Sequence, residues 1–119
     1  MDRKKMKQEY KQNPPPGGIF QVKNLVSGKI LVGKCTNSHG ALDRERFSLN
    51  TGGHRSRELQ QDWNRLGPDC FSFELLEVLE RDKDPKVDYA GELDALLELW
   101  LERLEPYGEK GYNPAPRIK

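Results

Sequence analysis

The sequence predicts an α+β domain in which a small central three-stranded, mainly antiparallel sheet is flanked by helices. Two observations predict the sheet. Residues 18–24 and 29–34 are short apolar runs joined by a turn, and residues 70–79 alternate apolar and polar side chains, as in a strand with one buried face. A third observation predicts the main core helix, because apolar side chains recur at helical spacing from Asp88 to about Leu104 and must pack on the sheet.

A basic arm is predicted to precede the domain. Three consecutive prolines at 14–16 end any helix there, because proline lacks an amide hydrogen and clashes with the preceding turn. We therefore divide the chain into an arm with a Pro-rich linker (1–16), a domain (17–114) and a tail (115–119). At the start of the domain, Gly28 can adopt the positive φ that a tight hairpin requires, so it joins the first two strands.

Two short helices, near 41–50 and 56–66, are predicted between the hairpin and the third strand. Glycines end the first helix, and a Gly-Pro pair ends the second, in which Leu59 and Trp63 recur at helical spacing. Trp63 and, on the long helix, Trp100 lie on apolar helix faces. This pattern predicts that both tryptophans are core residues.

The net charge of +1 conceals an uneven distribution. Residues 74–105 hold eleven acidic and four basic side chains, a net charge of −7, which leaves +8 for the rest of the chain. A basic half can meet the phosphate backbone of DNA, whereas an acidic helix is more often a solvated face. The charge distribution alone makes nucleic acid one candidate partner. A protein-interaction domain that uses the acidic helix is an alternative that depends on this segment alone.

The cysteines and the hydropathy pattern disfavour several classes of protein. Cys35 and Cys70 are too few and too far apart for a zinc site or a disulfide framework, and we interpret both as buried thiols. No apolar stretch is long enough to span a bilayer, and the N-terminus lacks the apolar centre of a signal peptide. We expect a cytoplasmic chain with no membrane partner and no small-molecule cofactor.

Several spaced motifs resemble those of one known family. The first strand begins with Gly-Ile-Phe at 18–20, and the second ends with Leu-Val-Gly at 31–33. With the stretches at 54–60 and 63–67 and the closing Gly-Tyr-Asn at 111–113, these motifs resemble the GIY-YIG nuclease superfamily, in particular the catalytic domain of phage-type intron-homing endonucleases. The resemblance covers about residues 17–114.

The resemblance implies a fold, an activity and a set of site positions. In the superfamily, two tyrosines, a helix arginine and a glutamate gather on one face of a small antiparallel sheet and cleave DNA through a divalent ion. It therefore implies a DNA endonuclease that uses Mg²⁺ or Mn²⁺. The motif positions in this chain are Gly18, Phe20, Leu31, Gly33 and Asn113.

Four of the implied site positions carry apolar residues here. Phe20 replaces the first tyrosine and loses its hydroxyl, and Leu31 replaces the second. The family's arginine would fall on Leu42, and its metal-binding glutamate would fall on Leu97. Phe20 and Leu31 are most simply core residues of the hairpin.

The candidate catalytic residues of an altered site are Arg44, Arg46, His54 and Glu98, with Glu98 as the candidate metal ligand. Each also has a plain structural interpretation. The two arginines and Glu98 can be solvated helix charges, His54 a loop or capping residue, and Asn113 a turn residue. Two functions remain open: a divalent-metal-dependent DNA endonuclease with an altered active site, or a catalytically inactive nucleic-acid-binding or protein-interaction module of the same fold.

Overall fold

The computed structural model describes residues 15–81, 84 and 86–116. The predicted elements are all present, with their ends moved by at most one residue. The predicted arm, apart from residues 15–16, and the last three residues of the predicted tail lie outside the described residues. In chain order the elements are β1 (Gly17–Asn24), β2 (Ile30–Cys35), α2 (Ala41–Thr51), α3 (Arg57–Leu66), the 3₁₀ turn η1 (Pro68–Cys70), β3 (Phe71–Leu79), α4 (Tyr89–Leu104) and the 3₁₀ turn η2 (Gly108–Lys110).

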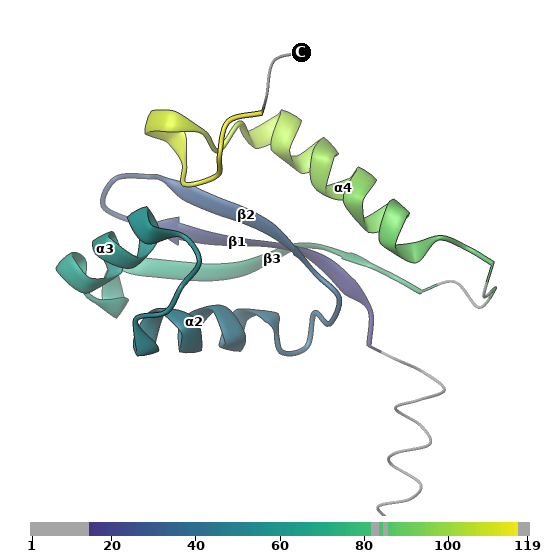
Figure 1. Cartoon of the computed structure of the whole chain (residues 1–119), viewed down its shortest axis with the longest axis horizontal. Helices are drawn as coiled ribbons and strands as arrows, with labels where there is room; N and C mark the ends of the chain where they lie inside the picture. Colours follow the sequence, from purple (N-terminus) through teal and green to yellow (C-terminus); the bar gives the residue numbers. More distant parts are fainter. Residues whose placement is uncertain (1–14, 82–83, 85, 117–119) are drawn as a thin grey trace, which may run out of the picture.

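The three strands form one antiparallel sheet in the order β2-β1-β3, so β1 is central and β2 lies at an edge (Figure 1). A tight turn joins β1 to β2. Gly28 has a φ of 82° in this turn, as predicted, and its amide donates to the carbonyl of Asn24 at 2.8 Å. The Asn24 side chain also accepts hydrogen bonds from the amides of Val26 and Ser27, which fixes the loop.

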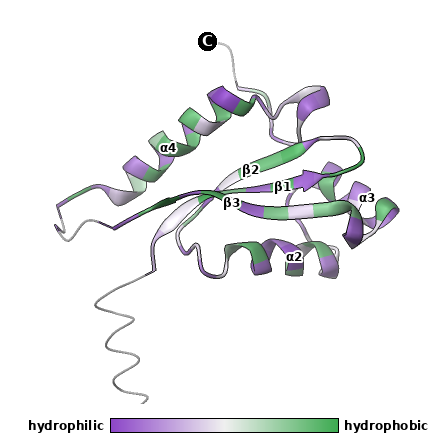
Figure 2. Ribbon diagram, turned by 180° about the vertical axis from the view of Figure 1, so that it is seen from behind, coloured by the Kyte–Doolittle hydropathy of each residue, from purple (hydrophilic) through white to green (hydrophobic). Residues whose placement is uncertain are grey.

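Helices cover both faces of the sheet, because successive strand residues point to opposite sides. Phe20 and Leu31 pack with α2 and α3 on one face, whereas Ile19 and Val32 pack with α4 on the other. Figure 1 shows α4 on the side of the sheet opposite to α2, and Figure 2 shows polar and apolar residues alternating along both helices. The acidic helix and the two central helices are therefore separated by the sheet.

Helix α4 begins at the N-cap Asp88, whose side chain accepts from the amide of Gly91 at 3.0 Å. Leu93 is its most deeply buried side chain, at 2% exposure. The prediction that both tryptophans are core residues is right for Trp63, which is 5% exposed, but only partly for Trp100. The Trp100 indole is half-buried, because its N–H reaches a polar partner, Glu77, on the edge strand β3.

The two cysteines are free thiols; Cys35 is buried and Cys70 is half-buried. Among the described residues, no helix is long and apolar enough to cross a membrane.

Candidate functional site

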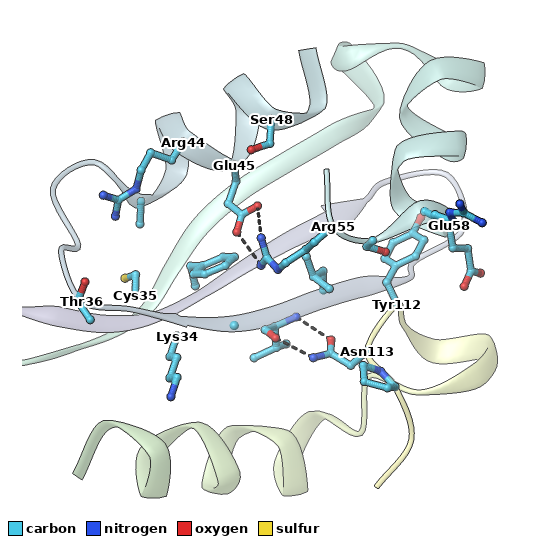
Figure 3. Close-up of a pocket in the computed structure, with 18 residues that line it drawn as sticks. Lys34, Cys35, Thr36, Arg44, Glu45, Ser48, Arg55, Glu58, Tyr112 and Asn113 are labelled. Carbon is cyan, nitrogen blue, oxygen red and sulfur yellow. Dashed lines mark hydrogen bonds and ion pairs between the residues drawn. The ribbon is translucent and has the colours of Figure 1, made fainter. Parts of the chain in front are cut away.

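A cleft of about 1020 Å³ lies along the edge strand β2, between α2, the start of α3 and the C-terminal segment 112–114 (Figure 3). Apolar residues of the hairpin and of α2 line it: Phe20, Leu31, Val32 and Ala41. Four cations and two carboxylates also line it: Lys34, Arg44, Arg55, Arg57, Glu45 and Glu58. A cleft with an apolar base and several cations is suited to an anionic ligand that carries apolar groups.

The two glycine-bearing motifs meet in the base of this cleft. Phe20 pairs with Gly33 across the β1–β2 ladder, and a Cβ built on Gly33 would lie 2.7 Å from the Cζ atom of Phe20. The Phe20 ring therefore fits here because Gly33 has no side chain. Phe20 is 2% exposed and Leu31 is 6% exposed, which confirms both as core residues. Neither side chain can donate or accept a hydrogen bond.

A buried carboxylate, Glu45 on α2, organises the polar side of the cleft. Its side chain is only 7% exposed. Arg55 binds both carboxylate oxygens, Nη2 to Oε1 at 2.8 Å and Nη1 to Oε2 at 3.2 Å, and His54 Nε2 lies 2.6 Å from Oε2. Burial raises the pKa of the Glu45 carboxyl, but the hydrogen bonds from His54 and Arg55 and the Arg55 charge outweigh burial and lower it below its ordinary value. Glu45 is therefore ionised at neutral pH.

His54 is locked inside this network. The Ser56 amide donates to His54 Nδ1 at 3.0 Å, so Nδ1 is an acceptor and the ring proton is on Nε2, which donates to Glu45. The His54 side chain has no exposed surface. Its backbone amide donates to Gln60 Oε1 at 3.1 Å, and the Gln60 amide group donates in turn to the Leu49 carbonyl. Both ring nitrogens are thus occupied, and neither can take a proton from a water in the cleft.

Asn113 completes the exposed edge of β2. Its Oδ1 accepts from the Val32 amide at 2.9 Å, and its Nδ2 donates to the Val32 carbonyl at 2.7 Å (Figure 3). The side-chain amide thus replaces a neighbouring strand at this point. Next to it, Gly111 forms a parallel bridge with Ile30. Both the oxygen and the nitrogen of the Asn113 side chain are therefore bound to the backbone of β2.

Tyr112 anchors the same C-terminal segment to α3. Its hydroxyl donates to Asp62 Oδ2 at 2.7 Å and accepts from Asn24 Nδ2 at 3.0 Å. Burial, together with the Asp62 carboxylate beside the hydroxyl, raises the pKa of Tyr112 to about 12. The tyrosine is therefore neutral at physiological pH.

The predicted site residues are not all gathered at this cleft. Arg44 lines it, and the buried His54 reaches it only through Glu45. Arg46 instead lies over the Phe73 ring, 4.7 Å from its centroid. Glu98 is exposed on α4, across the sheet from α2, and is not among the residues that line the cleft.

The two apolar replacements on the helices are packing residues. Leu42 packs against the core beneath α2, and Leu97 packs against the core beneath α4. The sequence reasoning did not select Glu45, Arg55 or Arg57, all of which line the cleft. The run of arginines around the predicted His54 was a usable signal for Arg55. Glu45 gave none, because its burial depends on where α2 packs.

A divalent ion, which the superfamily resemblance implies, does not fit the donors at this cleft. Both Glu45 oxygens are bound to cationic or N–H donors, and Glu58 forms an ion pair with Lys29. Among the described residues, no group of three or more His, Cys, Asp or Glu side chains could hold a metal ion. We therefore assign no chemical step in this cleft to a metal.

Comparisons with known proteins agree with the fold. The chain is similar to the catalytic domain of the homing endonuclease I-TevI, with a TM-score of 0.67 and 28% identity over 84% of this chain and 99% of that domain. A variant of the same catalytic domain gives a TM-score of 0.65 and 26% identity over 82% of this chain and 92% of that one. The resemblance to GIY-YIG nucleases is thus confirmed.

A full-length relative shows the same likeness in sequence. Over 67 residues, 56% of this chain, the sequence is 33% identical to intron-associated endonuclease 1 of Enterobacteria phage T4. The chain spans about a quarter of that protein, because the match covers 27% of its length. No protein-family model matches the sequence.

Proposed function

We propose that this chain is a DNA-binding domain with the GIY-YIG nuclease fold, and that the cleft along β2 receives the phosphate backbone. The likeness to homing endonuclease catalytic domains supports DNA as the ligand. The observation that carries the proposal is the charge of the cleft. Four cations line it against two carboxylates, and each of those carboxylates is already paired with a cation.

Two cations of the cleft have no carboxylate partner, so their whole charge is available to DNA. Arg44 and Arg57 form no ion pair within the described part of the chain, and both side chains are exposed. The acidic helix α4 lies across the sheet, and its Asp94 forms an ion pair with Lys34 at the cleft. Contacts between arginines and backbone phosphates carry no sequence information, so we expect sequence-tolerant binding.

An endonuclease with an altered active site is the second candidate, because the structural relatives are catalytic domains. The cleft supports binding better than cleavage. Phe20 and Leu31 carry no hydroxyl, His54 has no free ring nitrogen, and Glu98 lies across the sheet. The chemistry of phosphodiester hydrolysis needs a group to activate water and a group to stabilise the developing charge, and none of these four residues supplies the first of them in the cleft.

A gel-shift titration at two ionic strengths tests the proposed binding. We expect a dissociation constant in the micromolar range or above that rises steeply with salt. Non-specific DNA binding typically has a dissociation constant of roughly 10⁻⁴ to 10⁻⁶ M at physiological salt. Arg44→Ala weakens binding, whereas Arg103→Ala, an exposed arginine on α4, is the matched control and leaves it unchanged. The absence of any shift at low salt with duplex or branched DNA would contradict the proposal.

Nicking of supercoiled plasmid separates the two candidate functions. We expect no nicking by the wild-type chain with Mg²⁺ or Mn²⁺. Metal-dependent nicking that Arg46→Ala and Glu98→Ala each abolish, with both variants folded, would instead establish the altered-site endonuclease. Both side chains are exposed, and Arg46→Ala removes only a surface contact with the Phe73 ring, so we expect both variants to fold.

A further inference from the structure

We infer that Arg55 is the residue that fixes a DNA phosphate in this cleft, and that Glu45 and His54 are its positioning residues. The bound phosphodiester is then neutralised by a protein cation and needs no bridging divalent ion. This inference rests on the proposed DNA binding and adds to it the residue, its supports and the metal-free character of the contact.

The two partners of the Arg55–Glu45 ion pair differ sharply in exposure. The Glu45 side chain is 7% exposed, whereas the Arg55 side chain is 60% exposed. A surface ion pair between two mobile side chains fixes little, because both lose conformational freedom to meet. Here the carboxylate is held in the protein, so it fixes one edge of a guanidinium whose remainder lies in the cleft.

Arg55 keeps N–H donors for a ligand after it has bound Glu45. A guanidinium has five N–H groups in a rigid plane, and the two contacts to Glu45 use one N–H on each terminal nitrogen. Within the described part of the chain, the remaining three N–H groups of Arg55 have no hydrogen-bond partner. Planar, paired donors of this kind match the oxygens of a phosphate.

Glu45 is itself held in place by hydrogen bonds from neighbouring residues. His54 binds Glu45 through Nε2 and is itself held by the Ser56 amide at Nδ1. Gln60 accepts from the His54 backbone amide and donates to the Leu49 carbonyl, which ties this loop to the end of α2. The chain of bonds therefore runs from the backbone to the guanidinium without a gap. Arg55 finally lies over the Phe20 ring, with 5.9 Å between its Cζ and the ring centroid.

The other cleft arginines lack such support. Arg44 donates one hydrogen bond, to the Asn37 carbonyl at 3.1 Å, and both partners of that bond are on the surface. Arg57 has no side-chain partner within the described residues. Among the cleft arginines, Arg55 alone is held by a buried side chain, and preorganisation lowers the entropy lost when a ligand binds.

The test measures DNA binding of the full chain by fluorescence anisotropy in EDTA, over a series of salt concentrations. We expect wild-type binding to persist without divalent ions. Arg55→Ala should weaken it by roughly tenfold to a hundredfold, because charge-assisted hydrogen bonds are lost, and should lower the slope of log K against log salt by about 0.9. Arg55→Lys should recover only part of the affinity, because an ammonium cannot hold Glu45 and phosphate in one plane.

If Glu45 positions Arg55, replacing Glu45 changes the DNA affinity in the opposite direction to the change expected from charge alone. Removing a negative charge from a DNA-binding cleft by Glu45→Gln would by itself strengthen binding. If Glu45 positions Arg55, Glu45→Gln weakens binding several-fold instead, and Arg55→Ala then has a smaller effect in the Glu45→Gln background than in the wild type. Urea unfolding of each variant confirms that it is folded, and the salt slope does not depend on the folded fraction.

Three results would overturn the inference. Wild-type affinity with unchanged salt slope in Arg55→Ala would remove Arg55 from the contact. Tighter binding by Glu45→Gln, with the full Arg55→Ala effect retained, would show that Glu45 acts only as a charge. Binding that appears only when Mg²⁺ or Mn²⁺ is added would show that a metal is required. Failure of the wild type to bind DNA at all would overturn the proposed function as well, whereas the three results above leave DNA binding intact.

Discussion

Replacing Asn113 tests whether this residue holds the sheet edge or contacts a ligand. Its side-chain amide makes two hydrogen bonds to the backbone of Val32, at 2.9 Å and 2.7 Å. A typical net contribution is about 1 kcal/mol for each hydrogen bond, so Asn113→Ala should lower the free energy of unfolding by about 2 kcal/mol. With a urea m-value of about 2 kcal/mol/M, the midpoint of unfolding falls by about 1 M.

Asn113→Asp sharpens the same test. The aspartate keeps an acceptor for the Val32 amide but places a second carboxylate oxygen against the Val32 carbonyl, where the wild type has a donor. We expect it to be at least as destabilising as Asn113→Ala at neutral pH. This repulsion disfavours the charged form in the folded state, so the pKa of the new carboxyl is raised on folding and the defect shrinks as the pH falls through that pKa.

Chemical denaturation followed by circular dichroism measures both variants, and the gel shift supplies the comparison. If Asn113 instead contacts DNA, Asn113→Ala weakens binding while its urea midpoint stays at the wild-type value. That pair of results would refute the structural role argued here.

Three further predictions concern the hairpin glycines and two titrating groups. Gly33→Ala should lower the free energy of unfolding by about 1–3 kcal/mol, because the Phe20 ring can turn away from the new Cβ. Gly18→Ala should lower it further, because its Cβ would lie 2.3 Å from a backbone carbonyl oxygen of β3. The reverse order in urea unfolding would be inconsistent with this geometry. Alkaline absorbance titration should show one tyrosine that ionises at about 12. Tyr112→Phe should remove that component. Because the folded pKa of Tyr112 is raised, its stabilisation is complete below about 10 and is lost as the pH rises through about 12. The pKa of Glu45 is lowered in the folded state. The stabilisation that Glu45 provides is therefore present above the ordinary pKa of 4.5 and is lost as the pH falls below that value. Glu45→Gln should accordingly flatten the acid side of a plot of stability against pH.

The fold followed from local patterns that tertiary packing did not override. Strand alternation, the turn at Gly28 and the apolar stripe of α4 each depend on neighbouring residues, so the sequence contains them directly. Trp100 is less buried than predicted, because the apolar stripe of α4 carries no information on the width of the sheet beneath it. Its indole reached Glu77 at the border of the core instead of a buried position.

The site was harder to predict, because its chemistry depends on which faces meet. Sequence spacing placed Glu98 one position from where the family's metal-binding glutamate would fall, but the hairpin's Phe20 and Leu31 point to the opposite face of the sheet from α4. The burial of Glu45 could not be predicted from the sequence either. A glutamate in a run of charged helix residues is normally solvated, and only the packing of α2 beside His54 and Arg55 buries it.

The most direct test of where DNA binds is an amide and arginine-side-chain NMR titration of the full chain with a short duplex in EDTA. We expect chemical shifts to change along β2, at Gly33 and Lys34, and at the side chain of Arg55, while those of the exposed surface of α4 around Glu98 stay unchanged. Shifts confined to α4, or an unchanged Arg55 side chain at saturating DNA, would contradict this expectation.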